Sequence, residues 1–233
     1  MARKKVVLVI VEGPSDDTAL GIMLSQIYNK NKVYVHIMHG DITTRKGVRS
    51  DNIVAKIGDE VRGYAKSNHY TPKDFKQIIH IVDMDGVYIP DENVILDLVQ
   101  DKTFYESDGI HTLDQQRIIE RNKQKRENLY RLRGTGQIYQ VPYRVYYMSC
   151  NLDHVLHNKR NSTDAEKETN AYAFAKKYKN DVDGFMKLIC DSDFSVGGDY
   201  KKSWAYIEDG LNSIDRYTNL GICIMEEIEK RSV

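Results

Sequence analysis

The sequence contains few residues that could cross-link the chain or anchor it in a membrane. It has three cysteines, Cys150, Cys190 and Cys223, without C-x-x-C spacing, which argues against a disulfide framework or a zinc cluster and favours a reducing compartment. No apolar run approaches the roughly 20 residues of a membrane-spanning helix. The basic start does not fit a secretion signal, because Glu12 stands where a small-residue cleavage site should lie. We therefore expect a cytoplasmic protein.

The sequence also lacks an excess of either charge. The 34 Lys and Arg residues balance the 34 Asp and Glu residues, so the formal net charge of the 233 residues is zero. Without a global basic field, any bound nucleic acid must meet a local basic patch or a metal ion. The chain contains no G-x-x-x-x-G-K-[S/T] motif, so we expect no P-loop nucleotide hydrolysis from it.

The first third of the sequence alternates between strand-like and helix-like patterns. A continuous apolar, β-branched run at residues 6–11 predicts a strand that is covered on both faces, and two further strands are predicted at residues 33–38 and 77–82. The segments between them carry apolar residues at helical spacing, namely Leu20, Met23, Leu24 and Ile27, then Ile53, Ile57, Val61 and Tyr64. This β-α-β-α-β order predicts an α/β fold with a mostly parallel, doubly wound sheet flanked by helices.

The pattern becomes looser after Asp85. We predict a short helix at residues 91–100, a loop at 101–112 and a basic helix at 113–133. A strand at 143–148 and the start of a further helix at 151–157 follow. Helical patterns follow from residue 162, and a last helix is predicted from the apolar stripe over residues 207–224. A weak boundary near residues 159–163 divides an α/β domain, 1–160, from a helical extension, 161–233, which packs on it or docks a partner.

Two acidic turns follow predicted strands. Glu12 comes directly after the first strand, and Asp83 and Asp85 come after the third. Binding sites in open parallel sheets form beyond the carboxyl ends of the strands, where these residues should gather. Packed carboxylates raise one another's pKa unless a cation neutralises them, and oxygen ligands favour Mg²⁺ or Mn²⁺. In a regular strand Asp83 and Asp85 would point to the same side, toward one ion.

Several neighbouring residues are conditional members of this predicted metal site. Asp16 lies four residues after Glu12, but it also fits a helix N-cap or a first-turn dipole partner. Asp153 follows the predicted fourth strand, although it could simply open a helix. Lys159 and Arg160 are candidate substrate contacts for phosphate, because they lie close to Asp153 in the sequence.

Other polar residues have weaker functional interpretations. His154 and His157 are three residues apart and could meet one metal, but without a third nitrogen or sulfur ligand nearby a capping or surface role is simpler. His80 lies within an apolar strand and fits a core position. The basic helix, with Tyr130 and Tyr139 available for base stacking, is either a phosphate-binding face or a solvated charged face that suits an acidic partner.

The segments VLVIVEGPSDDTAL and IIHIVDMDG, in this order, resemble the TOPRIM domain of topoisomerases, primases, recombination proteins and OLD-type nucleases. The family pattern is a Glu-Gly turn after the first strand and an Asp-x-Asp motif after the third. The form E-G-x-S-D is most similar to the OLD-type and RloB-like nucleases. The resemblance implies that Asp83 and Asp85 hold Mg²⁺, that Glu12 is a metal ligand or general acid/base, and that Asp16 serves the metal site. The segment SCNLDHVL, with Asp153, resembles the family's later acidic turn less specifically.

The resemblance implies a Mg²⁺-dependent nuclease that cleaves DNA or RNA and acts as the effector of an ATPase-coupled anti-phage defence system. The ATPase would then be a separate protein. Topoisomerase and primase activities are less suitable, because the chain is too short for a DNA gate or the additional polymerase elements. The alternative is a non-catalytic or latent TOPRIM interaction subunit that binds and regulates a partner ATPase, with the last helix as a candidate dock.

Overall fold

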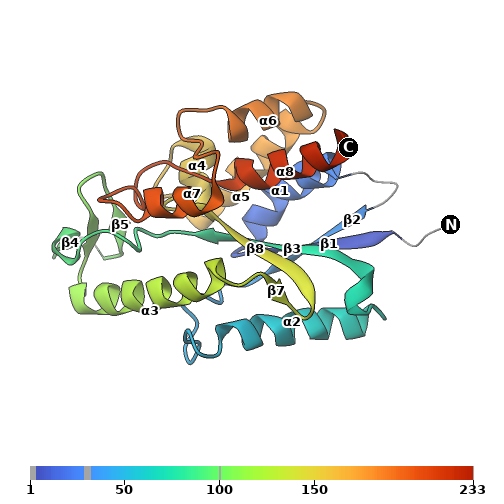
Figure 1. Cartoon of the computed structure of the whole chain (residues 1–233). Helices are drawn as coiled ribbons and strands as arrows, with labels where there is room; N and C mark the ends of the chain where they lie inside the picture. Colours follow the sequence, from blue (N-terminus) through green and yellow to red (C-terminus); the bar gives the residue numbers. More distant parts are fainter. Residues whose placement is uncertain (1–3, 29–32, 100, 233) are drawn as a thin grey trace.

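The apolar run at residues 6–11 forms an inner strand of a mostly parallel sheet in the computed structural model, which describes residues 4–28, 33–99 and 101–232 (Figure 1). Strand β1 (Lys5–Val11) pairs in parallel with β2 (Val33–His39) on one side and β3 (Phe75–Asp83) on the other. Strand β8 (Val141–Met148) adds in parallel to β3, and the short β7 (Gln137–Ile138) pairs antiparallel with β8. The order β2-β1-β3-β8-β7 confirms the predicted α/β class with a mostly parallel sheet.

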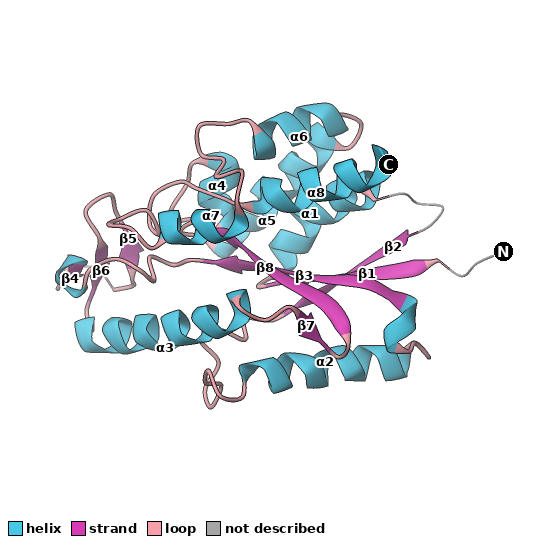
Figure 2. Cartoon of the chain, viewed as in Figure 1, coloured by secondary structure: helices cyan, strands magenta, loops and turns pink. Residues whose placement is uncertain are grey.

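Helices cover both faces of this sheet (Figures 1 and 2). One face carries α1 (Pro14–Ile27), α4 (Leu152–His157), α5 (Asp164–Tyr178), α6 (Val182–Cys190) and α8 (Leu220–Ser232). The opposite face carries α2 (Ile53–Ser67) and α3 (Gln115–Arg133). A single 3₁₀ turn, Pro72–Asp74, leads into β3. No helix in the described ranges is long and apolar enough to cross a membrane.

The side chains of β1 alternate between two cores. Val7 and Val9 pack with the helices of the α1 face, whereas Leu8 and Ile10 pack with α2 and α3. Because both faces are covered, the strand needs apolar residues at every position, which explains its continuous apolar run. The α1-side core also includes residues of α5, α6 and α8, among them Phe174, Phe185 and Ile224. The last third of the chain therefore packs on the sheet.

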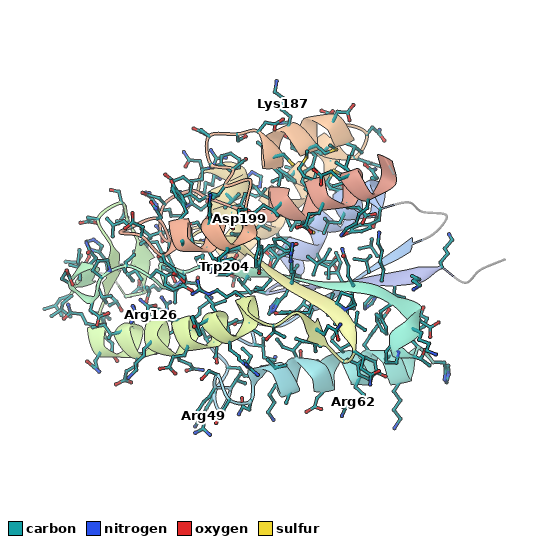
Figure 3. The ribbon with its side chains drawn as sticks, in the orientation of Figure 1. Arg49, Arg62, Arg126, Lys187, Asp199 and Trp204 are labelled. Carbon is teal, nitrogen blue, oxygen red and sulfur yellow. The ribbon has the colours of Figure 1, made fainter. Side chains whose placement is uncertain are left out.

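Helix α7 (Tyr200–Ile207) and the turn before α8 cover the part of β8 that has no neighbouring strand beyond the short β7. Trp204 of α7, labelled in Figure 3, is buried with its ring 5.3 Å from that of Tyr147. The backbone amide of Tyr147 donates to Asn219 Oδ1 at 2.8 Å, and Thr218 Oγ1 donates to the Tyr147 carbonyl at 2.8 Å. These side chains satisfy backbone groups that would otherwise form an open sheet edge.

Two predictions of secondary structure for residues 91–112 were wrong. The predicted helix at 91–100 is a 3₁₀ turn, Asp91–Asn93, followed by β4 (Val94–Leu96). The predicted loop contains β5 (Phe104–Tyr105) and β6 (Ile110–Thr112), which complete a small sheet in the order β4-β6-β5. Strands of two or three residues leave no periodic signal, because they depend on pairing with one another.

The predicted last helix is also interrupted. Helix α7 ends at Ile207, and α8 begins only at Leu220. Between them, Thr218 forms β-bridges with Met148 and Ser195, so its backbone is extended where the apolar pattern predicted a helix. Ile214, which lies on the expected helical stripe, instead packs with Ile110 of the small sheet in a separate apolar cluster. The β-bridges of Thr218 and the packing of Ile214 therefore outweigh the local preference of this segment for a helix.

Candidate active site

The two acidic turns meet at the centre of the sheet. The chain leaves β1 for β2 on one side and then returns to form β3 on the other, which creates a topological switch point. Ligands in open α/β sheets bind in the crevice at such a point, beyond the carboxyl ends of the strands. Glu12 follows β1, and its Oε1 accepts a hydrogen bond from the backbone amide of Asp83, the last residue of β3, at 3.1 Å. The structure thus brings Glu12 and Asp83 together.

Asp83 and Asp85 have different backbone environments. Strand β3 ends at Asp83, and Asp85 has a positive φ of 50°. The strand alternation that we expected to aim both residues at one ion therefore does not extend to Asp85. Asp83 Oδ1 accepts a hydrogen bond from the amide of Leu152 in α4 at 3.0 Å, while the amide of Asp85 donates to the Cys150 carbonyl at 2.6 Å. Asp83 faces α4, and the carboxylate of Asp85 contacts α3.

A buried lysine lies between the acidic turns. Lys125 of α3 has no exposed side-chain surface, and its ammonium lies 2.6 Å from Asp85 Oδ2 and 3.4 Å from Glu12 Oε1. One turn earlier, Arg121 Nη2 donates to the Asp85 carbonyl at 2.8 Å, and Nη1 donates to the Tyr105 hydroxyl at 3.1 Å. The sequence analysis missed both cations as site residues, because it treated α3 as a basic surface.

The sequence does contain a signal for Lys125. Ile118, Asn122, Lys125, Leu129 and Leu132 are all buried and follow a spacing of four, three, four and three residues. This is the stripe of an amphipathic helix that faces a core. A lysine on such a stripe must find a partner inside the protein, because burying an unpaired charge is strongly unfavourable.

The carboxylates differ in how their charges are compensated. Burial raises the pKa of Glu12 to about 8, although Lys125 acts in the opposite direction. Burial raises the pKa of Asp83 well above its usual range, and the neighbouring charges of Glu12 and Asp16 add to this effect. Burial would also raise the pKa of Asp85, but Lys125 and Arg121 outweigh it and lower the pKa. The charges of Lys125 and Arg121 therefore compensate the carboxylate of Asp85. No cation compensates the buried carboxylate of Asp83 enough to keep its pKa at the usual value.

Asp16 and Asp153 lie near Asp83 on the α4 side. Asp16 Oδ2 accepts a hydrogen bond from the Gly13 amide at 2.8 Å. Gly13 is the N-cap of α1 and Asp16 lies in the first turn, so Asp16 is not the N-cap that we considered but occupies the alternative first-turn position. Asp153 is buried in the first turn of α4, and its carboxylate accepts bonds from Asn170 Nδ2 at 3.4 Å. Asp16, Asp83 and Asp153 all line one small cavity of about 30 Å³, which is large enough to hold a water molecule.

A further strand-end carboxylate escaped the sequence analysis. Asp41 lies two residues after the end of β2, in a segment to which the sequence analysis assigned no role. Its Oδ1 accepts hydrogen bonds from the amide and hydroxyl of Thr43 at 2.9 and 2.8 Å. Burial raises its pKa, but the charge of Lys125 and the hydroxyls of Thr44 and Thr43 outweigh burial and lower it. The reasoning that selected Glu12 and Asp83, an acid just past a parallel strand, applies equally to Asp41.

Of the two predicted phosphate contacts, Arg160 is already paired and Lys159 is exposed. Arg160 Nη2 donates to Asp215 Oδ1 at 3.0 Å, and its Nε donates to the Ile214 carbonyl at 3.4 Å, so these guanidinium contacts are with the turn before α8. Lys159 is exposed beyond α4. The basic face of α3 is partly neutralised, since Arg126, labelled in Figure 3, lies 3.7 Å from Asp91 and Arg133 pairs with Glu208. Tyr130 on that face is 69% exposed. The face therefore still fits either a phosphate-binding surface or a solvated charged surface that suits an acidic partner.

The histidines occupy structural positions. His80 is buried, and its Nδ1 lies 2.8 Å from the Tyr143 hydroxyl, as expected for a core residue. His154 is buried in α4, where desolvation and the charges of Arg160 and Arg216 lower its pKa to about 4. His157 packs its ring against Phe174 at 5.7 Å. The burial of His154 contradicts the surface role that we expected for it, whereas His157 makes a structural packing contact.

The acidic turns fit some metal ions and not others. In the described ranges, no three His, Cys, Asp or Glu side chains are arranged to hold one ion. The ammonium of Lys125 contacts two of the carboxylates, Asp85 and Glu12. Mg²⁺ is commonly bound by one or two carboxylates together with waters and substrate phosphates, a demand that Glu12 and Asp83 can meet. A closed tetrahedral zinc site requires ligands that this cluster does not supply.

Comparisons of the chain with protein-family models, with curated proteins and with solved structures found no match. The fold class consequently rests on the strand order and helix layers described above. Any assignment of activity rests on the chemistry of Glu12, Asp83, Asp85 and the groups around them.

Proposed function

We propose that this chain is a Mg²⁺- or Mn²⁺-dependent TOPRIM-like nuclease that cleaves phosphodiester bonds in DNA or RNA. The observation that carries the proposal is the contact between Glu12 and Asp83 at the switch point of the sheet. Both carboxylates have raised pKa values, caused mainly by burial, so a divalent cation would be a favourable addition. The order of the acidic turns, which resembles that of TOPRIM nucleases, supports the same conclusion.

Each carboxylate in this proposal has a role that its contacts support. Asp83, oriented by the Leu152 amide, would hold the ion, with Glu12 as a second ligand or as the base that accepts a proton from the attacking water. Asp85 completes the acidic cluster, and Asp16 and Asp153 are additional candidate ligands across the small cavity. The ion, when bound, would polarise the phosphate and lower the pKa of its bound water.

The resemblance also supports a biological setting. We place the proposed nuclease as the effector of an anti-phage defence system that is coupled to a separate ATPase. This chain has no P-loop motif, so the nucleotide hydrolysis would belong to the partner. Lys159 and Arg160 remain proposed phosphate contacts, with Lys159 the more available of the two because Arg160 is paired with Asp215.

A second candidate function is an interaction subunit that binds and regulates the ATPase with little activity of its own. One observation favours it. Large apolar side chains are exposed on the segment that surrounds the small sheet: Leu96 at 50%, Leu98 at 77%, Val99 at 92% and Leu113 at 50%. Exposed apolar groups that gather in one region often mark a protein-binding surface.

Cleavage assays separate these two functions. The purified chain, alone and with its ATPase, should cleave labelled single- or double-stranded DNA or RNA with Mg²⁺ or Mn²⁺ and not with EDTA. Glu12→Gln and Asp83→Asn should each reduce the rate at least about 100-fold. Asp59→Asn, an exposed residue of α2 with 62% side-chain exposure, is the matched control. Full cleavage by both site variants, or no cleavage by the wild type under any of these conditions, would favour the interaction subunit.

A further inference from the structure

Lys125 is one of the largest fully buried side chains in the protein. It belongs to a polar stretch on the inner side of α3, in which Asn122, Lys125 and Asn128 are buried at three-residue spacing. Asn128 Nδ2 donates to the Thr43 carbonyl at 2.8 Å, so this helix is tied to the segment that follows β2. The backbone position of Lys125 is thereby set by packing, which holds its ammonium at the acidic turns.

The contacts of Lys125 divide the acidic cluster into two halves. Its Nζ is 2.6 Å from Asp85 Oδ2, and Arg121 holds the backbone carbonyl of the same aspartate at 2.8 Å. Asp83 instead contacts the α4 amide of Leu152 and lines the small cavity with Asp16. On one side, Lys125 and Arg121 lie in direct contact with Asp85. On the other side, Asp83 lines a cavity with Asp16 and Asp153, where Lys167 and His157 also contribute to the lining, and the pKa of Asp83 is nevertheless raised by burial and by the charges of Glu12 and Asp16.

We propose that Lys125 occupies the position of a second cation, so that the site takes a single divalent ion on the Asp83 side and presents the ammonium to the phosphate bound by that ion. This inference rests on the proposed function. It departs from the expectation that Asp83 and Asp85 together hold Mg²⁺.

Electrostatics and geometry both support a single ion. A second divalent ion beside Asp85 would lie against a buried ammonium, and like charges at such close range repel strongly in a low-dielectric interior. Displacing Lys125 would leave its charge unpaired in the core, because its contacts run to Asp85 and Glu12. An ammonium has three donors, of which Asp85 and Glu12 use two. Lys125 has no exposed side-chain surface, so the third donor would reach a phosphate oxygen only once the bound ion and substrate had displaced the groups that cover it.

The experiment counts bound ions directly. Mn²⁺ is titrated into the whole chain, and the ions bound per chain are measured by calorimetry and by the electron paramagnetic resonance signal of free Mn²⁺. The wild type should bind one ion. Lys125→Met, which keeps the length of the side chain and removes its charge, should bind two. Lys125→Arg and the control Lys56→Met, an exposed residue of α2, should each bind one.

A cleavage assay adds a second readout. Lys125→Met should lower kcat at least about 100-fold despite its additional ion, with a smaller change in KM, because the ammonium would act on the reacting phosphate. A purely structural lysine would not change the number of bound ions.

The possible results are distinguishable. Two ions in the wild type overturn the inference whether or not Lys125→Met folds, as does a single ion in a folded Lys125→Met variant. In either case the nuclease proposal survives if the wild type cleaves. A wild type that binds no Mn²⁺ and cleaves nothing overturns the proposed function and the inference together.

Discussion

The carboxylate of Glu12 accepts a hydrogen bond from the backbone amide of Asp83 at 3.1 Å, which joins the ends of two adjacent parallel strands. The two residues are 71 positions apart in the chain. Their contact places two carboxylates at one point, with Lys125 as the nearby ammonium. A protein selected only for stability gains little from such a cluster, because burying like charges together is unfavourable unless a cation compensates them.

Neutralising Asp83 should stabilise the protein when no divalent metal is present. The side chain is buried, and the charges of Glu12 and Asp16 oppose its ionisation. We expect Asp83→Asn to increase the free energy of unfolding at pH 8 in EDTA by about 1–2 kcal/mol, measured by urea denaturation. The exposed Asp59→Asn should change it by less than about 0.5 kcal/mol. A clear loss of stability in Asp83→Asn would show that the carboxylate is already compensated.

Glu12 should make stability depend on pH in the absence of metal. Its folded-state pKa of about 8 exceeds the ordinary value of 4.5, so the folded state binds more protons than the unfolded state between these two values. Stability therefore falls as the pH rises through this window. The raised pKa corresponds to a loss on the order of 3–5 kcal/mol, since each pKa unit is about 1.4 kcal/mol.

The pH effect is best measured as a difference between two proteins. Buried His80 and His154 have pKa values lowered to about 4 by burial, and they favour stability as the pH rises from about 4 to 6.5. This opposing contribution is shared by the wild type and Glu12→Gln. The stability of Glu12→Gln relative to the wild type should therefore increase from pH 4.5 to pH 8. A difference that does not change with pH would contradict the assignment to Glu12.

Gly109 should be required for the small sheet. A Cβ at this position would lie 1.9 Å from the carbonyl oxygen of Asn93, and the φ of Gly109 is 155°. We expect Gly109→Ala to destabilise the protein by at least about 2 kcal/mol, measured by thermal or urea unfolding. It should also lower cleavage, because the hydroxyl of Tyr105 in this sheet lies 3.5 Å from Asp85 Oδ1.

Gly63 provides the matched control for this substitution. It lies within α2, and a Cβ there would meet nothing within 4 Å. Gly63→Ala should be neutral or stabilising by up to about 1 kcal/mol, because alanine is the better helix former. Equal effects of the two substitutions would contradict the close approach at Gly109.

The sequence predicted the main sheet well because its signals are local. Continuous apolar runs marked β1, β2 and β3, and the acids that follow two of them could be placed at one sheet edge without coordinates. Strands β4, β5 and β6 could not be recognised, since two or three residues have no measurable period and gain their stability from one another. The split between α7 and α8 was missed because the bridges of Thr218 to Met148 and Ser195 outweigh the helical pattern.

The sequence by itself determined the α/β class and the order of the acidic turns, because each depends on spacing along the chain. Only the tertiary structure decided how the charges of these residues are matched. The parallel pairing of β1 with β3 brings Glu12 to Asp83, and the packing of α3 places Lys125 at Asp85. Charge compensation depends on distances between residues far apart in the chain, and the pKa difference between Asp83 and Asp85 follows from those distances.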